Sequence, residues 1–222
     1  MTHPRARRVG AVATVSILAA GALAACTTDV PTVPEQTTPS AMSSLGSSAL
    51  PTPTATPEIE EANDPADTDS WVVTENAVGP VEIAADYDET LDEIRATGIG
   101  PLDCDGVAYG FSEDNAYDVM ILEDGDADSG GIVEVTVGWN GDTMGVGPRT
   151  AEDLGVGSTK SQVLGTYDSA VESSSAIADR SFVEIADDDG TSTLVFTYLD
   201  GYDGAVSVSV ISGEEPAYEP CA

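Results

Sequence analysis

Two short stretches of the chain alternate regularly between apolar and polar residues. Valine occupies every second position in residues 133–137 and again in residues 206–210, an offset of 73 residues. This period of two is typical of a strand with one buried face. Similar patterns, separated by turn signals such as Asp189-Gly190 and Asp203-Gly204, predict strands at Val107–Phe111, Tyr117–Leu122, Ile132–Trp139, Ser181–Ile185, Thr193–Tyr198 and Ala205–Ile211.

Two other stretches have the spacing of helix starts. Thr90 is followed by Glu93, and Thr159 is followed by Gln162. In such a capping box the threonine oxygen accepts from the third amide of the helix and the acidic or amide side chain reaches back. We therefore expect short helices to begin at both threonines, the first ending near Gly98 and the second running to about residues 167–170.

These elements predict an α+β domain over residues 71–222. It would contain two similar halves, 71–141 and 142–222, each a helix followed by about three antiparallel strands. Together the strands would form one sheet with the short helices on one face. Residues Trp71–Val73 and Val81–Ile83 would add edge strands.

The segment Gly157-Ser-Thr-Lys-Ser-Gln-Val163 stands just before the second predicted helix. With this segment, the arrangement resembles the tandem helix-plus-sheet domains of β-lactamase inhibitor proteins and of small envelope-assembly lipoproteins. The first half departs from that pattern, since it has residues 84–87 (Ala-Ala-Asp-Tyr) where the second half has 155–158 (Gly-Val-Gly-Ser). The resemblance implies a fold and does not transfer a function.

The beginning of the chain has the layout of an export signal. Three arginines precede residue 9, and the stretch Val9–Ala25 is apolar and uncharged. Leu23-Ala24-Ala25-Cys26 then resembles the lipobox of bacterial lipoproteins. That resemblance implies cleavage of residues 1–25, lipid attachment to Cys26, and a location at the extracytoplasmic face of the cell membrane. The alternative is an ordinary secretory signal that is cut after Ala24.

Residues 26–70 are rich in Thr, Ser, Pro and Ala and contain few large apolar residues. Such a composition cannot bury enough surface to offset the entropy of ordering. We expect a disordered tether between the lipidated cysteine and the folded domain.

The mature chain is strongly acidic. All 40 Asp and Glu follow Cys26, and three of the seven Lys and Arg precede it, which leaves a net charge of 4 − 40 = −36. This charge opposes binding to nucleic acid or to anionic lipid headgroups and favours cations or basic proteins as partners. His3, the only histidine, lies in the signal. This excludes catalysis by histidine and metal coordination by histidine in the mature protein.

Two cysteines remain after Cys26. In an oxidising compartment Cys104 and Cys221 are expected to form a disulfide across 117 residues. Two free thiols are the alternative.

Two segments have the spacing of chemical sites. The acidic residues Asp124, Asp126 and Asp128 have the alternating spacing of a calcium loop, but Ser129 stands where that loop needs Gly and Val135 where it needs Glu. Calcium is therefore a candidate ligand, and a hairpin loop without an ion is the alternative.

Residues 155–161 (Gly-Val-Gly-Ser-Thr-Lys-Ser) resemble a phosphate-binding loop only superficially. Thr159 precedes Lys160 where glycine is required, and Leu154 replaces the first glycine. A Ser-Lys dyad of Ser158 or Ser161 with Lys160 is equally disfavoured, because adjacent helix residues do not face one another.

The sequence thus favours a lipid-anchored extracytoplasmic protein with a non-catalytic binding or structural domain, whose partner is an unknown protein or cell-wall ligand. A proteinaceous inhibitor of a secreted or surface enzyme is the alternative. It would use an exposed aromatic sheet face, with candidate anchors Tyr109, Tyr117, Trp139, Tyr198 and Tyr202. A carboxylate-based hydrolase is the third interpretation, although no pair of acids is marked out.

Overall fold

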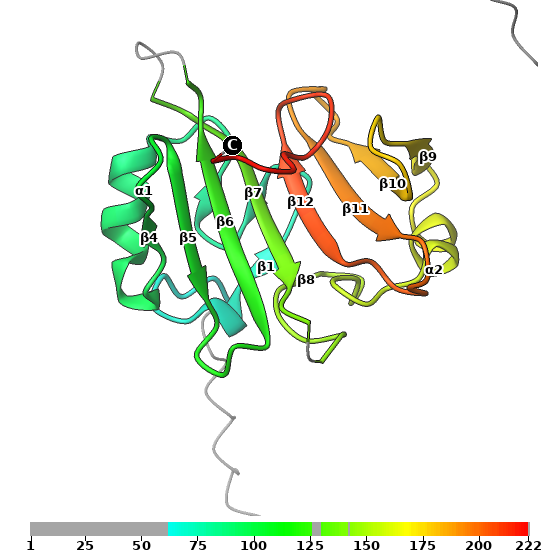
Figure 1. The fold of residues 1–222 in the computed structure, drawn as a ribbon, viewed down its shortest axis with the longest axis horizontal. Coiled ribbons are helices and arrows are strands. Elements are labelled where there is room, and N and C mark those ends of the chain that lie inside the picture. The colour runs from blue at the N-terminus through cyan, green and yellow to red at the C-terminus, as the bar shows by residue number, and fades with distance from the viewer. Residues whose placement is uncertain (1–61, 126–129, 142, 222) are drawn as a thin grey trace, which may run out of the picture. The chain divides into compact units, whose positions relative to one another are not determined.

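The computed structural model describes residues 62–125, 130–141 and 143–221. These residues form two sheets and two short α-helices (Figure 1). The chain is therefore of mixed type, as expected, but strands dominate it. The prediction of a single sheet is wrong, because four two-residue strands pair into a second sheet of their own.

The large sheet is antiparallel throughout the described residues. In spatial order its strands are β4 (Gly100–Pro101), β5 (Val107–Phe111), β6 (Tyr117–Glu123), β7 (Ile132–Trp139), β12 (Ser207–Ile211), β11 (Thr193–Leu199), β10 (Arg180–Ala186) and β9 (Val171–Ser174). The two alternating valine stretches are neighbours, with Val135 opposite Val210 and Val137 opposite Val208. The predicted strands match to within two residues at each end, whereas β4 and β9 were not predicted.

The small sheet has the order β3 (Val81–Glu82), β2 (Ala77–Val78), β1 (Val72–Val73) and β8 (Arg149–Thr150). The stretches expected as edge strands of the large sheet lie here instead, behind the large sheet in Figure 1. The reason is Trp71, which is buried in the core and pulls this segment inward. Gly79 permits this packing, since its φ is +59° and a Cβ there would come within 2.3 Å of the Trp71 ring.

The two helices differ in how well their starts were predicted. Helix α2 (Lys160–Thr166) begins after Thr159, and its capping box with Gln162 is present, as expected. Helix α1 (Tyr87–Ile94) begins one turn before the predicted position, because Asp86 is the N-cap and accepts from the Glu89 amide at 2.9 Å. Thr90 instead lies within this helix.

A short 3₁₀ turn (Arg95–Thr97) follows α1 and ends at Gly98, as the sequence predicted. The loop carrying Asp203-Gly204 turns elsewhere than predicted, since the left-handed residue there is Gly201, with φ +93°.

The main core lies on one face of the large sheet, where the small sheet and the helices also contribute. Its largest buried side chains include Trp71, Tyr117, Phe196 and Ile121. The other face, which we call the outer face, carries the alternate residues of each strand. Here Phe182, Val195 and Ile211 form a second, smaller buried cluster.

The folded structure includes residues that precede the predicted domain boundary at Trp71. The Trp71 indole donates to the backbone oxygen of Asp64 at 2.8 Å. The Tyr117 hydroxyl donates to the Asp69 carboxylate at 2.6 Å, which fixes a 3₁₀ turn (Thr68–Ser70) against the sheet. The predicted tether therefore ends earlier than residue 70, and residues 1–61 lie outside the described part.

Candidate functional site

The outer face of β5 and β6 exposes apolar side chains. Tyr109 and Phe111 on β5 lie opposite Met120 and Asp118 on β6, and Leu122 follows on the same face. The Phe111 side chain is 46 % exposed, and the other four are partly exposed. The Tyr109 and Phe111 rings meet edge to face, with centroids 5.1 Å apart. We call these five residues the open half of the outer face.

Asp118 is the charged member of the open half. Its carboxylate accepts a hydrogen bond from Tyr109, while burial raises the pKa of Asp118. Burial and the neighbouring carboxylate raise the pKa of Tyr109 to about 12, so its hydroxyl stays protonated and donates. Gly138 lies opposite Asp118 on β7, and a Cβ there would fall 2.4 Å from the carboxylate oxygen. The acid is therefore held in one place within an apolar surface.

The C-terminal residues 212–221, which we call the strap, follow β12 and then turn back across the ends of β12 and β7 toward β6 (Figure 1). The Glu215 carboxylate accepts from Ser175 Oγ at 2.6 Å and from the Ala176 amide at 3.2 Å. Arg180 on β10 donates to the Pro216 backbone oxygen at 3.3 Å. Pro216 itself is buried. The strap thus packs over part of the outer face of β12, β11, β10 and β9, and we call the outer face of these four strands the strapped half.

A buried carboxylate lies under the strap. Glu134 on β7 is only 5 % exposed, and its two oxygens accept from the Ala217 amide at 2.9 Å and from Thr136 Oγ1 at 2.7 Å. Thr136 Oγ1 lies 2.6 Å from Ser209 Oγ on β12. Burial raises the pKa of Glu134, although these hydrogen bonds and Arg180 partly oppose that rise.

The structure brings Cys104 and Cys221 to disulfide distance, with Cα atoms 5.6 Å apart. Cys104 lies between β4 and β5, so the pair ties the end of the strap to the side of the sheet that carries the open half. This is the arrangement expected of the predicted disulfide.

The predicted aromatic anchors divide into two groups. Tyr117 and Tyr198 are buried in the core, so neither ring can serve as an exposed anchor on a protein-binding sheet face. Tyr109 and Trp139 are partly exposed, and Tyr202 is 48 % exposed. Sequence reasoning missed Phe111, although its alternation with Tyr109 on a predicted strand was a signal that could have identified it.

The residues weighed for a Ser-Lys dyad do not assemble one. Ser158 is buried and accepts from the Gly155 amide at 3.0 Å. Ser161 Oγ lies 3.1 Å from Thr159 Oγ1, and Lys160 forms an ion pair with Glu172. Each side chain is therefore engaged elsewhere.

The remaining predicted sites lie partly outside the described residues. Cys26 is among residues 1–61, and Asp126 and Asp128 are among residues 126–129, so the calcium loop stays a prediction. Of that loop, Asp124 is described, and its amide donates to the Gly131 oxygen at 2.8 Å. In the described parts of the chain, no cluster of three or more metal-ligating side chains is found.

The two carboxylates whose pKa burial raises on the outer face are poorly placed for hydrolysis. Asp118 lies opposite Gly138, four residues from Glu134 along β7, which corresponds to about 13 Å of strand. Paired carboxylates of glycosidases stand about 5–10 Å apart. Moreover, Glu134 lies beneath the strap.

Comparison with known proteins adds no family: no family model, curated protein or solved structure matches this chain. Within residues 62–125, 130–141 and 143–221, no helix is long and apolar enough to cross a membrane.

Proposed function

We propose that this protein is a lipid-anchored, non-catalytic binding module at the extracytoplasmic face of the cell membrane, and that the open half docks a basic protein. The observation that carries the proposal is the exposed Phe111–Tyr109 pair beside the fixed Asp118 carboxylate. Aromatic side chains are enriched at the buried centre of protein interfaces.

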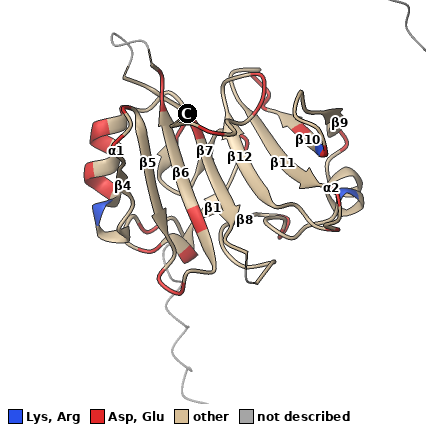
Figure 2. Cartoon of the chain, viewed as in Figure 1, with Lys and Arg blue, Asp and Glu red and all other residues tan. Residues whose placement is uncertain are grey.

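The surrounding charge supports a basic partner. Acidic side chains lie mainly on α1 and on the connections at the strand ends, whereas the strands carry few (Figure 2). The apolar surface is therefore bordered by negative charge, which attracts a basic protein and repels acidic ones. The Asp118 carboxylate would accept from an arginine or lysine of that partner at the centre of the contact.

Lipid anchoring rests on the sequence of residues 1–26. The arginines, the apolar stretch and Leu23-Ala24-Ala25-Cys26 support it. An inhibitor of lipoprotein signal peptidase should leave a larger, lipidated precursor, and Cys26→Ala should leave an uncleaved precursor without lipid in the absence of inhibitor. Normal cleavage in both cases would rule out the anchor and leave the docking proposal intact.

We also infer that the domain consists of two copies of one unit. The four strands that follow α1 (β4 to β7) and the four that follow α2 (β9 to β12) lie side by side in the large sheet, where β7 pairs with β12. The spatial order of the second four is the reverse of their order in the sequence. Thr136 and Ser209, which lie directly opposite one another at the seam, are 73 residues apart, the offset of the valine stretches.

The docking proposal can be tested by cross-linking in intact envelopes. A photoreactive amino acid is placed at Phe111 or, as the matched control, at Val171, which is 60 % exposed on the outer face of β9. We expect one predominant adduct with a basic protein from position 111, lost when Asp118 is changed to Lys, and no such adduct from position 171. Equal labelling from both positions, or no adduct at 111, would contradict the proposal.

The inhibitor function is the second candidate, and the exposed aromatic surface is what favours it. If the protein cross-linked at Phe111 is a secreted or surface enzyme, adding purified protein should lower that enzyme's activity. Undiminished activity of the bound enzyme would leave the docking role and exclude inhibition.

A further inference from the structure

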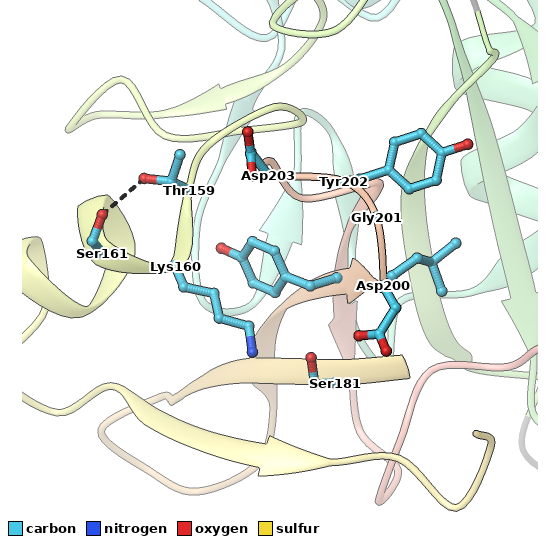
Figure 3. A pocket seen from close by; sticks show the side chains of 10 residues that line it. Thr159, Lys160, Ser161, Ser181, Asp200, Gly201, Tyr202 and Asp203 are labelled. Carbon is cyan, nitrogen blue, oxygen red and sulfur yellow. Dashed lines mark hydrogen bonds between the residues drawn. The ribbon is translucent and has the colours of Figure 1, made fainter. Parts of the chain in front are cut away.

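A pocket of about 570 Å³ lies between the start of α2 and the loop that follows β11. Its lining includes Thr159, Lys160 and Ser161 from the α2 end, Ser181 from β10, and Tyr198 with residues 199–203 from β11 and its loop (Figure 3). This volume lies within the range of sites that hold small molecules. The pocket is on a different part of the domain from the open half, so it is a separate candidate site.

The two walls of the pocket are joined through glycine. The Gly157 amide donates to the Ala205 oxygen at 2.8 Å, and the Ala205 amide donates to the Ser158 oxygen at 2.9 Å. A Cβ on Gly204 would lie 2.5 Å from the Gly157 oxygen, and Gly157 has a φ of +86°. Only glycine fits at these two positions. The Gly-Ser-Thr segment before α2 therefore fixes the pocket wall.

The chemistry of the lining restricts the ligand. Lys160 is the chain's only lysine, and it is already paired with Glu172. Asp200 and Asp203 stand on the opposite side of the lining (Figure 3). An anion would meet two carboxylates and a neutralised amine, which disfavours it. The lining offers acceptors from the acids, donors from the amine, and five hydroxyls, two of them from tyrosines, that can do both.

Tyr198 contributes a buried polar atom to this lining. Its side chain is 3 % exposed, and its hydroxyl has no hydrogen-bond partner among the described residues. The Lys160 ammonium lies 5.4 Å from the centre of its ring. Burial raises the pKa of Tyr198, so the hydroxyl remains a donor at neutral pH. A buried hydroxyl without a partner is costly, and a ligand hydroxyl that reached it would supply one.

We propose that this pocket binds a neutral, polyhydroxylated ligand, such as a short segment of a glycan. Every sugar hydroxyl both donates and accepts, which matches a lining of mixed acids, amine and hydroxyls. Tyr202, which is 48 % exposed, offers an aromatic surface for the apolar side of a sugar ring. The site is independent of protein docking at the open half.

Trp139 provides a built-in reporter of occupancy. Its ring meets that of Tyr202 edge to face, with centroids 5.2 Å apart, so a ligand against Tyr202 should change Trp139 emission. The full-length protein in detergent is titrated with triacetylchitotriose and cellotriose as neutral probes and with trigalacturonate as an anionic probe. We expect saturable binding of at least one neutral probe and none of the anionic one.

The matched variants are Tyr198→Phe and Tyr87→Phe. Both remove a buried hydroxyl that has no partner in the described structure, but Tyr87 does not line this pocket. Tyr198→Phe should weaken binding about tenfold, the effect of one lost hydrogen bond, and Tyr87→Phe should not. Phe111→Ala should also leave sugar binding unchanged, which separates this proposal from the docking proposal.

Three outcomes would overturn the proposal. They are the absence of saturable binding by both neutral probes, tighter binding of trigalacturonate, and equal effects of the two tyrosine substitutions. Unfolding curves of both variants confirm that each is folded at the temperature of the titration.

Discussion

The strapped and open halves of the outer face expose their aromatic side chains very differently. Phe182 in the strapped half is 1 % exposed, whereas Phe111 in the open half is 46 % exposed. Both belong to the same sheet face, by the alternation of their strands. The difference lies in the strap, because the Arg180 guanidinium that lies over the Phe182 ring also contacts Pro216 and Tyr218 of the strap. A surface closed in this way contributes to stability, and a surface left open is available for a partner.

Removing the disulfide should change the strapped half more than any other substitution proposed here. Replacing Cys104 and Cys221 together by Ser should free the strap and lower the free energy of unfolding by roughly 4–5 kcal/mol, the chain-entropy value for a loop of this length. Urea unfolding of the oxidised protein and the double variant measures the change. Thiol counting provides the control, since the oxidised mature protein should show neither thiol. Equal stability of both forms would mean that the strap is held by its other contacts alone.

Truncating the two phenylalanines compares the halves directly. Phe182→Ala removes a ring from the buried cluster with Val195 and Ile211 and should cost about 3 kcal/mol of unfolding free energy. Phe111→Ala removes an exposed ring and should cost less than about 1 kcal/mol, while abolishing the cross-linked adduct. Thermal unfolding of both variants gives the ranking. A reversed ranking would show that the open half is part of the structural core.

Glu134 lies under the strap and Glu215 belongs to it. Their contributions to the free energy of unfolding should change with pH in opposite directions. Burial raises the pKa of Glu134, so the ionised form costs stability above that pKa. Glu134→Gln should therefore be more stable than the unmodified protein at pH 7, by up to about 1 kcal/mol. The gain should vanish below the ordinary pKa of glutamate, where the carboxyl is protonated in both the folded and the unfolded protein.

Glu215→Gln is the matched control. Hydrogen bonds from Ser175 and Ala176 lower the pKa of Glu215, so its contribution is present above the ordinary pKa and is lost as pH falls through the lowered value. This variant should be slightly less stable at pH 7, and the deficit should disappear in acid. Unfolding midpoints between pH 3 and pH 8 test both signs, and deviations of the same sign would refute the assignment.

The sequence predicted the long strands well and the short ones poorly. Valine alternation in β7 and β12 is a strong local signal, and it also identified two strands that turn out to be neighbours. Strands of two residues, such as β1 and β8, have no period to detect. Their pairing depends on Trp71 and Gly79, which meet only in the folded chain.

The helix starts show how two local signals compete. Thr159 has both partners of its capping box and no better cap before it. Thr90 has the same spacing, but Asp86 precedes it by one turn and caps the helix first, which leaves the Thr90 hydroxyl to donate to the Asp86 oxygen. Aspartate is as good an N-cap as serine and better than threonine.

The candidate site was harder to predict than the fold. Tyr117 and Tyr198 are indistinguishable from Tyr109 by residue type, and only strand register places the first two in the core. The strap has almost no regular pattern, so its position over β7 and β10 could not be read from periodicity. The expected pairing of Cys104 with Cys221 was the one sequence signal for the position of the strap.

The disulfide between Cys104 and Cys221 also sets an order of events during synthesis. Cys221 is made 117 residues after Cys104, so the ribosome must finish every strand of the sheet before the two sulfurs can meet. Until then the strap does not cover the apolar cluster around Phe182, and the Cys104 thiol has no native disulfide partner. A helper that shields nascent chains, or an oxidant that acts late, would raise the yield of correctly closed molecules.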